Sequence, residues 1–360
     1  MITVTKPSIP DKKRLYGYID RALNSRWLTN DGPLVCELKE RLEDYLGVNN
    51  LLLVANGTLG LLVSLKIAGC EKVLTTPFSF PATSAAPVWS NISVCYGDIC
   101  SRTYNLLPPR RVNVDRVDGI LATHVYGNPC DLEGMDRLSR EWCVPVLYDA
   151  AHAFGVEVDG RSVLLFGDMS ILSFHATKLF HCVEGGAIRF GKEEDYLAAR
   201  EMINFGYNSK GGLNSVGINA KMNELEAAMG LAVLDEIDSI LDGYRSCYEL
   251  YDELLDEELI RQSVPNNVSY NFSYFSIRFP DGDCLDQAVK LLNEENIFPR
   301  QYFSPSLDEL EIFGCHDPCD ISRDIAAKIL CLPIYADLPE GSIRQICEIV
   351  NKVIQTQRTK

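Results

Sequence analysis

The chain has 360 residues, 46% of them hydrophobic and 23% charged, which is ordinary for a globular protein and long enough for one large domain and a smaller one. The 50 acidic and 34 basic side chains give a formal net charge of −16, and no run rich in lysine or arginine appears, which argues against a nucleic-acid-binding protein. No apolar run approaches the ~20 residues of a membrane helix and residues 1–10 lack the apolar core of a signal peptide, so we expect a cytoplasmic protein.

The 13 cysteines are scattered without the paired spacing of a metal site. Cys315 and Cys319 come closest, with His316 between them, but no second Cys/His pair accompanies them. We therefore expect no zinc site. With no export route in view, we expect the cysteines to be reduced thiols.

The first 50 residues predict an extended arm and two amphipathic helices. Leu15, Ile19 and Leu23 recur at helical spacing, and a second apolar stripe begins at Leu34 and ends before Gly47. In order, we expect an arm at 1–10, a helix at 11–26, a loop with turn residues at 27–33 and a helix at 34–46.

From residue 51 the pattern changes to alternating short apolar strands and helices. The expected strands are 51–55, 72–76, 93–96, 119–125 and 144–148. One expected helix begins at 56–58 and ends near 69, and two more lie at 79–89 and 131–142. This β-α-β-α order predicts a largely parallel sheet with helices on both faces.

The second half of the chain predicts the end of this sheet and a further small α/β unit. We expect a hairpin at 157–163, strands at 169–174 and 186–190, a helix at 193–205, a glycine-bearing loop at 206–217 and a long helix from 220 to about 255. Beyond it we expect strands at 270–279 and 298–303 and helices at 285–295 and 343–354. The domains expected are a large one at 1–235 and a small one at 236–360.

Two apolar runs in this pattern each lead to a single charged residue. The run 144–147 is followed by Asp149, and the run 169–174 leads through a short turn to Lys178, ahead of Gly185 and Gly186. One carboxylate and one amine at the ends of buried strands suit a pyridoxal phosphate site. Lys178 would form a Schiff base with the cofactor, and Asp149 would pair with the pyridine nitrogen. The simpler alternatives are a surface lysine and a strand-end cap.

The stretch 148–186 resembles the fold-type I, pyridoxal-phosphate-dependent sugar aminotransferases of the DegT/StrS family. The resemblance extends from about Trp27 to about Pro333. It is carried also by residues 27–33 (WLTNDGP), 56–58 (NGT), 76–80 (TPFSF) and 126–131 (YGNPCD). These motifs are most similar to the branch that makes dTDP-4-amino-4,6-dideoxyglucose. The resemblance implies an α/β fold: a large domain with a mostly parallel sheet between helices, and a smaller C-terminal α/β domain.

The resemblance also assigns residues to the phosphate and the ring of the cofactor. Gly57 and Thr58 open a helix after the first buried strand and, with Ser173, would form the phosphate site. Phe80 would stack on the pyridine ring, although an aromatic residue at a helix start is as often plain core.

Two further cofactor residues depend more heavily on the resemblance. His152 occupies a place where the family more often has glutamine; a neutral imidazole can still donate one N–H to the phenolic oxygen, and the alternative is a packed core histidine. Asn219 resembles the asparagine that reaches the phosphate from the other subunit, which implies a homodimer with shared active sites.

Polar loop residues are the candidates for the nucleotide-sugar site. Lys210 offers a point charge for a diphosphate, and each candidate has an ordinary surface residue as its alternative. The candidates are Thr29, Asn30, Tyr126, Asn128, Asn208, Lys210, Arg300 and Tyr302.

The resemblance implies an aminotransferase that takes an amino group from glutamate and aminates a dTDP-linked 4-keto-6-deoxy sugar, with Lys178 as the proton carrier. The same chemistry at C3, or on a UDP- or GDP-linked sugar, is the nearest alternative. A dehydratase of the family would have histidine in place of Lys178. A binding protein without chemistry would not need Asp149, Ser173 and Lys178 together, and an unrelated α/β protein would not carry so many agreeing motifs.

Overall fold

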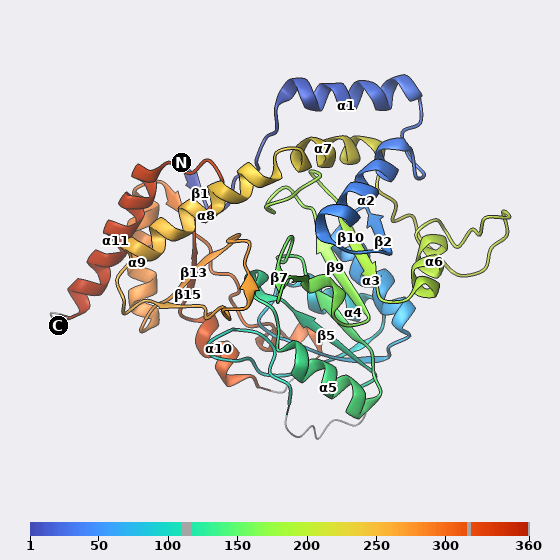
Figure 1. The fold of residues 1–360 in the computed structure, drawn as a ribbon. Coiled ribbons are helices and arrows are strands. Elements are labelled where there is room, and N and C mark those ends of the chain that lie inside the picture. Colours follow the sequence, from blue (N-terminus) through green and yellow to red (C-terminus); the bar gives the residue numbers. More distant parts are fainter. Residues whose placement is uncertain (110–116, 315–317, 359–360) are drawn as a thin grey trace.

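In the computed structural model, residues 1–109, 117–314 and 318–358 are described. Cys315 and His316, two of the three residues weighed as a metal motif, lie outside these ranges. Within the described ranges, no helix is both long enough and apolar enough to cross a bilayer. The fold is α/β, as expected, and is built around one seven-stranded sheet (Figure 1).

The central sheet has the strand order β2-β10-β9-β6-β5-β3-β4. Its strands are β2 (Leu51–Val54), β3 (Lys72–Thr75), β4 (Ser93–Tyr96), β5 (Gly119–Thr123), β6 (Val146–Asp149), β9 (Met169–Ser173) and β10 (Gly186–Phe190). All neighbouring strands are parallel except β10, which runs antiparallel to both β2 and β9. The mainly parallel sheet expected from the strand–helix alternation is confirmed.

Helices cover both faces of the sheet because its strands are apolar on both sides. In β2, Leu51 and Leu53 join one hydrophobic core, while Leu52 and Val54 join another on the opposite face. The helices of this part are α1 (Lys12–Ser25), α2 (Pro33–Leu46), α3 (Gly57–Ala68), α4 (Ala82–Trp89), α5 (Leu132–Trp142), α6 (Glu193–Met202) and α7 (Glu224–Leu234). Figure 1 shows α1 lying along α7 at one edge of the molecule.

The C-terminal part packs helices against a small antiparallel sheet of order β11-β13-β15. Its elements are α8 (Ile237–Leu254), β11 (Ile260–Arg261), β13 (Phe275–Arg278), α9 (Gly282–Glu294), α10 (Asp320–Ala326), β15 (Ile329–Leu332) and α11 (Glu340–Arg358). In Figure 1 they gather on the side of the molecule opposite α6.

Two short pairings tie the two parts of the chain together. The arm strand β1 (Ile2–Thr3) runs parallel to β14 (Ile297–Phe298). The expected hairpin forms from β7 (Glu157–Val158) and β8 (Arg161–Ser162), and β12 (Val268–Ser269) pairs with it.

The 3₁₀ turns are η1 (Val125–Gly127), η2 (Val163–Leu165), η3 (Leu307–Glu309) and η4 (Glu311–Phe313).

The long helix expected from 220 to about 255 is instead two helices, α7 and α8, separated at Asp235. The Asp235 carboxylate binds Arg41 Nη2 at 2.8 Å and accepts a hydrogen bond from the Tyr18 hydroxyl at 3.1 Å. Before α7, the chain is bridged to the sheet, since Lys221 pairs with Val54. Tertiary contacts therefore determine both ends of α7, although the apolar periodicity of the sequence continues past them.

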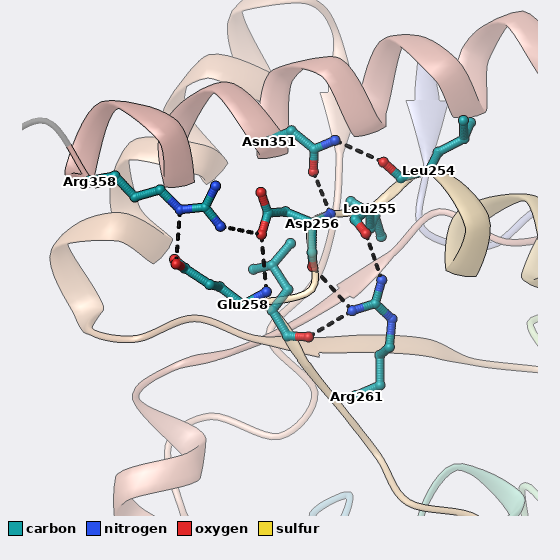
Figure 2. A network of polar contacts seen from close by, with 8 residues as sticks. Leu254, Leu255, Asp256, Glu258, Arg261, Asn351 and Arg358 are labelled. Carbon is teal, nitrogen blue, oxygen red and sulfur yellow. Dashed lines mark hydrogen bonds and ion pairs between the residues drawn. The ribbon is translucent and has the colours of Figure 1, made fainter.

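The C-terminal helix is fastened to the end of α8 by a polar network (Figure 2). Asn351 donates to the Leu254 carbonyl at 2.8 Å and accepts from the Asp256 N–H at 2.9 Å. Arg358 binds the carboxylates of Asp256 and Glu258, each at 2.8 Å. Carbonyl and N–H groups left free at the end of α8 thereby find partners on α11.

Candidate active site

The antiparallel strand β10 brings the site together. In the register, its first residue, Gly186, stands opposite Ser173 on β9 and opposite Val54 on β2. A Cβ on Gly186 would lie 2.8 Å from the backbone nitrogen of Gly57, so only glycine lets these segments approach. The end of β2, the start of α3 and the end of β9 therefore meet at one edge of the sheet.

Asp149 is the last residue of β6 and is buried, with 5% of its surface exposed. Its Oδ2 accepts a hydrogen bond from Thr83 Oγ1 at 2.7 Å, and its Oδ1 accepts from the Ala151 N–H at 3.1 Å. Burial raises the pKa of Asp149 above its ordinary value, while these two donors and the nearby Lys178 oppose the rise. A buried carboxylate of this kind is stabilised by a positive partner.

Lys178 lies in the loop between β9 and β10 and lines a cavity together with Asp149. Its Nζ donates a hydrogen bond to the Tyr274 hydroxyl at 3.2 Å. Burial lowers the pKa of Lys178 to about 8, and the charge of Asp149 opposes that shift. The lowered pKa leaves roughly a tenth of the amines neutral at pH 7, far more than for an ordinary lysine, and the neutral amine is the nucleophile.

His152 is buried in the loop after β6 and is held as a neutral imidazole. Its Nδ1 accepts the Tyr126 N–H at 3.2 Å, which leaves the proton on Nε2. Burial lowers the pKa of His152 well below its ordinary value, and the charge of Lys178 lowers it further. The ring thus has one N–H available to donate.

The start of α3 lies beside these groups and offers backbone amides that suit an anion. Asn56 caps the helix by accepting the Leu59 N–H at 2.8 Å, and the first amides of the helix, at Gly57 and Thr58, have no partner within the helix itself. A Cβ on Gly57 would lie 3.1 Å from Ser173 Cβ. The Ser173 hydroxyl therefore stands next to this helix start.

One cavity of about 650 Å³ joins most of the residues expected at the cofactor. The predicted residues that line it are Gly57, Thr58, Phe80, Asp149, His152, Ser173, Lys178 and Tyr302. A second hollow of about 450 Å³ shares Phe80 and Tyr302 with it and adds Arg300.

Other predicted residues lie outside these hollows of the single chain. Tyr126 and Asn128 are fully buried: Tyr126 packs on the cavity residues Tyr274 and Phe303, and Asn128 Nδ2 donates to the Ser263 carbonyl at 3.0 Å. Thr29 and Asn30 are exposed in the loop before α2. Asn208, Lys210 and Asn219 lie on or beside the loop 206–217, which extends away from the body beyond α6 in Figure 1.

Several residues in or next to the cavity carried no signal in the sequence. Thr83, which bonds Asp149, is on α4, and Tyr274, which bonds Lys178, directly precedes β13. Phe303 lines the cavity and stacks on His152 with 5.9 Å between ring centroids. Nothing short of the tertiary structure joins these residues to the motifs, because they are distant in sequence and ordinary in type.

The residues present fit pyridoxal phosphate. Asp149 offers the buried acceptor that a protonated pyridine nitrogen needs, and Lys178 offers an amine of lowered pKa for covalent attachment. The start of α3, with its two glycine-dependent contacts, offers a cradle for the phosphate. His152 offers one N–H to the phenolic oxygen.

Comparison with known proteins agrees with this geometry. The family model described as the DegT/DnrJ/EryC1/StrS aminotransferase family matches residues 11–351. The chain is 36% identical to a dTDP-4-amino-4,6-dideoxy-D-glucose transaminase of Shigella dysenteriae, covering 98% of this chain and 99% of that protein. A protein of the same name from Escherichia coli is 34% identical, covering 97% and 98%.

A solved structure, that of DesI in the presence of its TDP-sugar product, superimposes with a TM-score of 0.92 at 31% identity, covering 99% of this chain and 95% of that one. Fold, site and sequence similarity thus lead to one conclusion. The chain belongs to the DegT/DnrJ/EryC1/StrS aminotransferase family and is a pyridoxal-phosphate-dependent aminotransferase of fold-type I.

Proposed function

We propose that this aminotransferase moves an amino group from glutamate to C4 of dTDP-linked 4-keto-6-deoxyglucose, giving dTDP-4-amino-4,6-dideoxyglucose. The observation that carries the proposal is the meeting of the Lys178 amine, the Asp149 carboxylate and the start of α3 in one cavity. The choice of sugar is supported by the names of the Shigella dysenteriae and Escherichia coli relatives, which match almost the whole chain.

Pyridoxal phosphate, when bound, supplies the electron sink for amino transfer. Lys178 Nζ removes the proton from the Cα of the amino donor and returns protons in the second half-reaction. Asp149, when ionised, would stabilise positive charge at the pyridine nitrogen. His152 Nε2 would donate a hydrogen bond to the phenolic oxygen, and Phe80 would cover the ring. Gly57, Thr58 and Ser173 would hold the phosphate.

We assign the nucleotide-sugar to the mouth of the cavity. Tyr302 lines both hollows, and Arg300 supplies a cation in the second one. The exposed residues Thr29, Asn30 and Lys210 and the half-buried Asn208 remain proposed contacts for the nucleotide. Tyr126 and Asn128 are proposed to act as supports of the cavity wall, because both are fully buried.

The working form is proposed to be a cytoplasmic homodimer with shared active sites. Asn219 is exposed and lies outside the residues that line the cavity of its own chain. Apolar side chains around it and the early loop are also exposed, such as Trp27, Phe205 and Ile218. These features support a partner surface across which Asn219 reaches the second phosphate site.

A product assay tests the proposed function. The enzyme is loaded with cofactor and given glutamate and dTDP-4-keto-6-deoxyglucose, and the new amine is located by NMR. An equatorial amine at C4, absent with Lys178→Ala, is the expected result. An amine at C3, or turnover only with UDP- or GDP-linked sugars, would refute the substrate. Turnover by Lys178→Ala at the wild-type rate would refute the catalytic assignment.

A further inference from the structure

Tyr274 lies at the end of the Lys178 side chain, although none of the sequence motifs contains it. Lys178 Nζ donates to the Tyr274 hydroxyl at 3.2 Å but lies 5.8 Å from the centroid of the ring. The amine therefore contacts the hydroxyl and not the face of the ring. The two residues are 96 positions apart in the chain, so the contact depends on how the C-terminal part packs on the sheet.

The segment that carries Tyr274 is fixed to the loop after β6. Asn271 Nδ2 donates to the carbonyl oxygens of His152 at 2.8 Å and Phe154 at 2.9 Å. Ser273 Oγ donates to Asn271 Oδ1 at 2.9 Å. Asn271 and Ser273 are buried, so these bonds are shielded from water. The segment thus keeps a defined position relative to the loop after β6, which carries His152.

The ring of Tyr274 is held by its neighbours as well. It stacks on Tyr126, with 5.3 Å between centroids and 29° between planes, and it packs against His152 at 4.7 Å. Tyr126 is itself fully buried. The packing of the ring therefore fixes the position of the phenol oxygen.

The hydroxyl can serve the amine in both of its protonation states. Burial raises the pKa of Tyr274 well above its ordinary value, so the phenol stays neutral. A neutral hydroxyl accepts from an ammonium group and donates to a neutral amine. The other titratable groups that line this cavity are Asp149 and His152 from β6 and its loop, Tyr302 from the C-terminal part, and His175 and Glu184 from the lysine loop itself.

We propose that Tyr274 is a positioning residue for the catalytic amine: its hydroxyl holds Lys178 Nζ in place while the amine carries a proton between substrate and cofactor carbons. The proposal rests on the proposed role of Lys178. The proton leaves a C–H bond, forms an N–H bond on Nζ, and is returned to carbon from the same nitrogen. The ammonium formed in between donates to the Tyr274 oxygen, a charge-assisted contact.

Tyr274→Phe removes the hydroxyl and keeps the ring packing. Tyr270→Phe is the matched control: it lies in the same segment, and its hydroxyl donates to the Tyr126 carbonyl at 2.7 Å without touching Lys178. The first readout uses enzyme freed of cofactor. Arylation of Lys178 by trinitrobenzenesulfonate, which attacks only the neutral amine, is followed across a pH series by peptide mass spectrometry.

We expect the midpoint of Lys178 arylation near pH 8 in the wild type. In Tyr274→Phe it should fall by about one pH unit, because the charge-assisted bond that the ammonium loses is stronger than the bond that the neutral amine loses. In Tyr270→Phe it should stay in place. An unchanged midpoint in Tyr274→Phe, or an equal shift in both variants, would overturn the proposal.

The second readout uses the loaded enzyme. With Tyr274→Phe, kcat should fall about tenfold or more while KM for the sugar changes by less than about twofold. The isotope effect with α-deuterated glutamate should grow, because proton transfer becomes slower relative to the other steps. A fall in kcat without a larger isotope effect would contradict the positioning role. Should the wild type act on another sugar, the arylation titration still decides about Tyr274, since it needs neither cofactor nor substrate.

Discussion

Replacing Glu224 by glutamine should destabilise the fold strongly, although it only exchanges one carboxylate oxygen for an NH₂ group. Glu224 is the first residue of α7 and is fully buried. Its Oε2 accepts the Leu34 N–H at 2.9 Å and its Oε1 accepts the Val35 N–H at 2.8 Å. Its carboxylate thus caps the start of α2, where Gly32 provides no side-chain cap.

The expected magnitude follows from these two bonds. A hydrogen bond to a charged acceptor contributes about 1.5–3 kcal/mol, and an anion at a helix start adds roughly 0.3–1 kcal/mol. Glutamine keeps one neutral acceptor and turns an NH₂ group toward the other N–H. A Cβ on Gly32 would lie 2.6 Å from Glu224 Cδ, so the site has little room for a replacing water. We expect a loss of about 2–4 kcal/mol in the free energy of unfolding.

The assay is guanidinium unfolding at a fixed concentration of protein and cofactor, since ligand binding shifts apparent stability. Glu37→Gln is the control. Glu37 lies on the same helix α2 and pairs with Arg21 at 2.5 Å, but both side chains are partly exposed, so its loss should change stability by less than about 1 kcal/mol. A Glu224→Gln midpoint equal to that of Glu37→Gln would refute the reasoning.

Three further predictions concern other parts of the molecule. Asp149→Asn should lower kcat roughly hundredfold or more while Thr83 keeps its partner, which steady-state kinetics will check. Burial lowers the pKa of His124 to about 3, so the folded state excludes a proton that the unfolded chain binds; stability should fall as pH drops from about 6.5 towards 3, and denaturant midpoints for His124→Asn should show a weaker fall. Asn351→Ala should cost roughly 1–3 kcal/mol in denaturant unfolding with kinetic constants unchanged, because both of its bonds join α11 to α8 (Figure 2).

The sequence by itself determined the alternation of strands and helices and the ends of the two strands that carry the chemistry. Asp149 closes β6 and Lys178 follows β9, because in each case a short apolar run meets a polar residue that a sheet interior does not accept. Gly57 could be recognised as a point of close backbone approach, though not as a neighbour of Gly186. These properties depend on residue type and on the order of neighbouring residues, so they can be predicted from the sequence.

Only the tertiary structure decided which distant residues complete the site. The register of β10 placed Gly186 between β2 and β9, and a run of apolar residues gives no sign of strand direction. Thr83 and Tyr274 reached Asp149 and Lys178 across 66 and 96 positions of the chain. The break between α7 and α8 likewise depends on Asp235 meeting Arg41 and Tyr18.

Polar residues after strands show the same limit. Ser173, at the end of β9, lines the cavity, whereas Tyr126 and Asn128, equally plausible in sequence, are fully buried and do not line it. Whether a polar side chain faces a ligand or bonds a backbone carbonyl depends on what packs beside it, as the Ser263 carbonyl does beside Asn128. The sequence determines the residue type and its position after a strand. The hydrogen-bond partner of each side chain depends on packing between segments that are far apart in the chain.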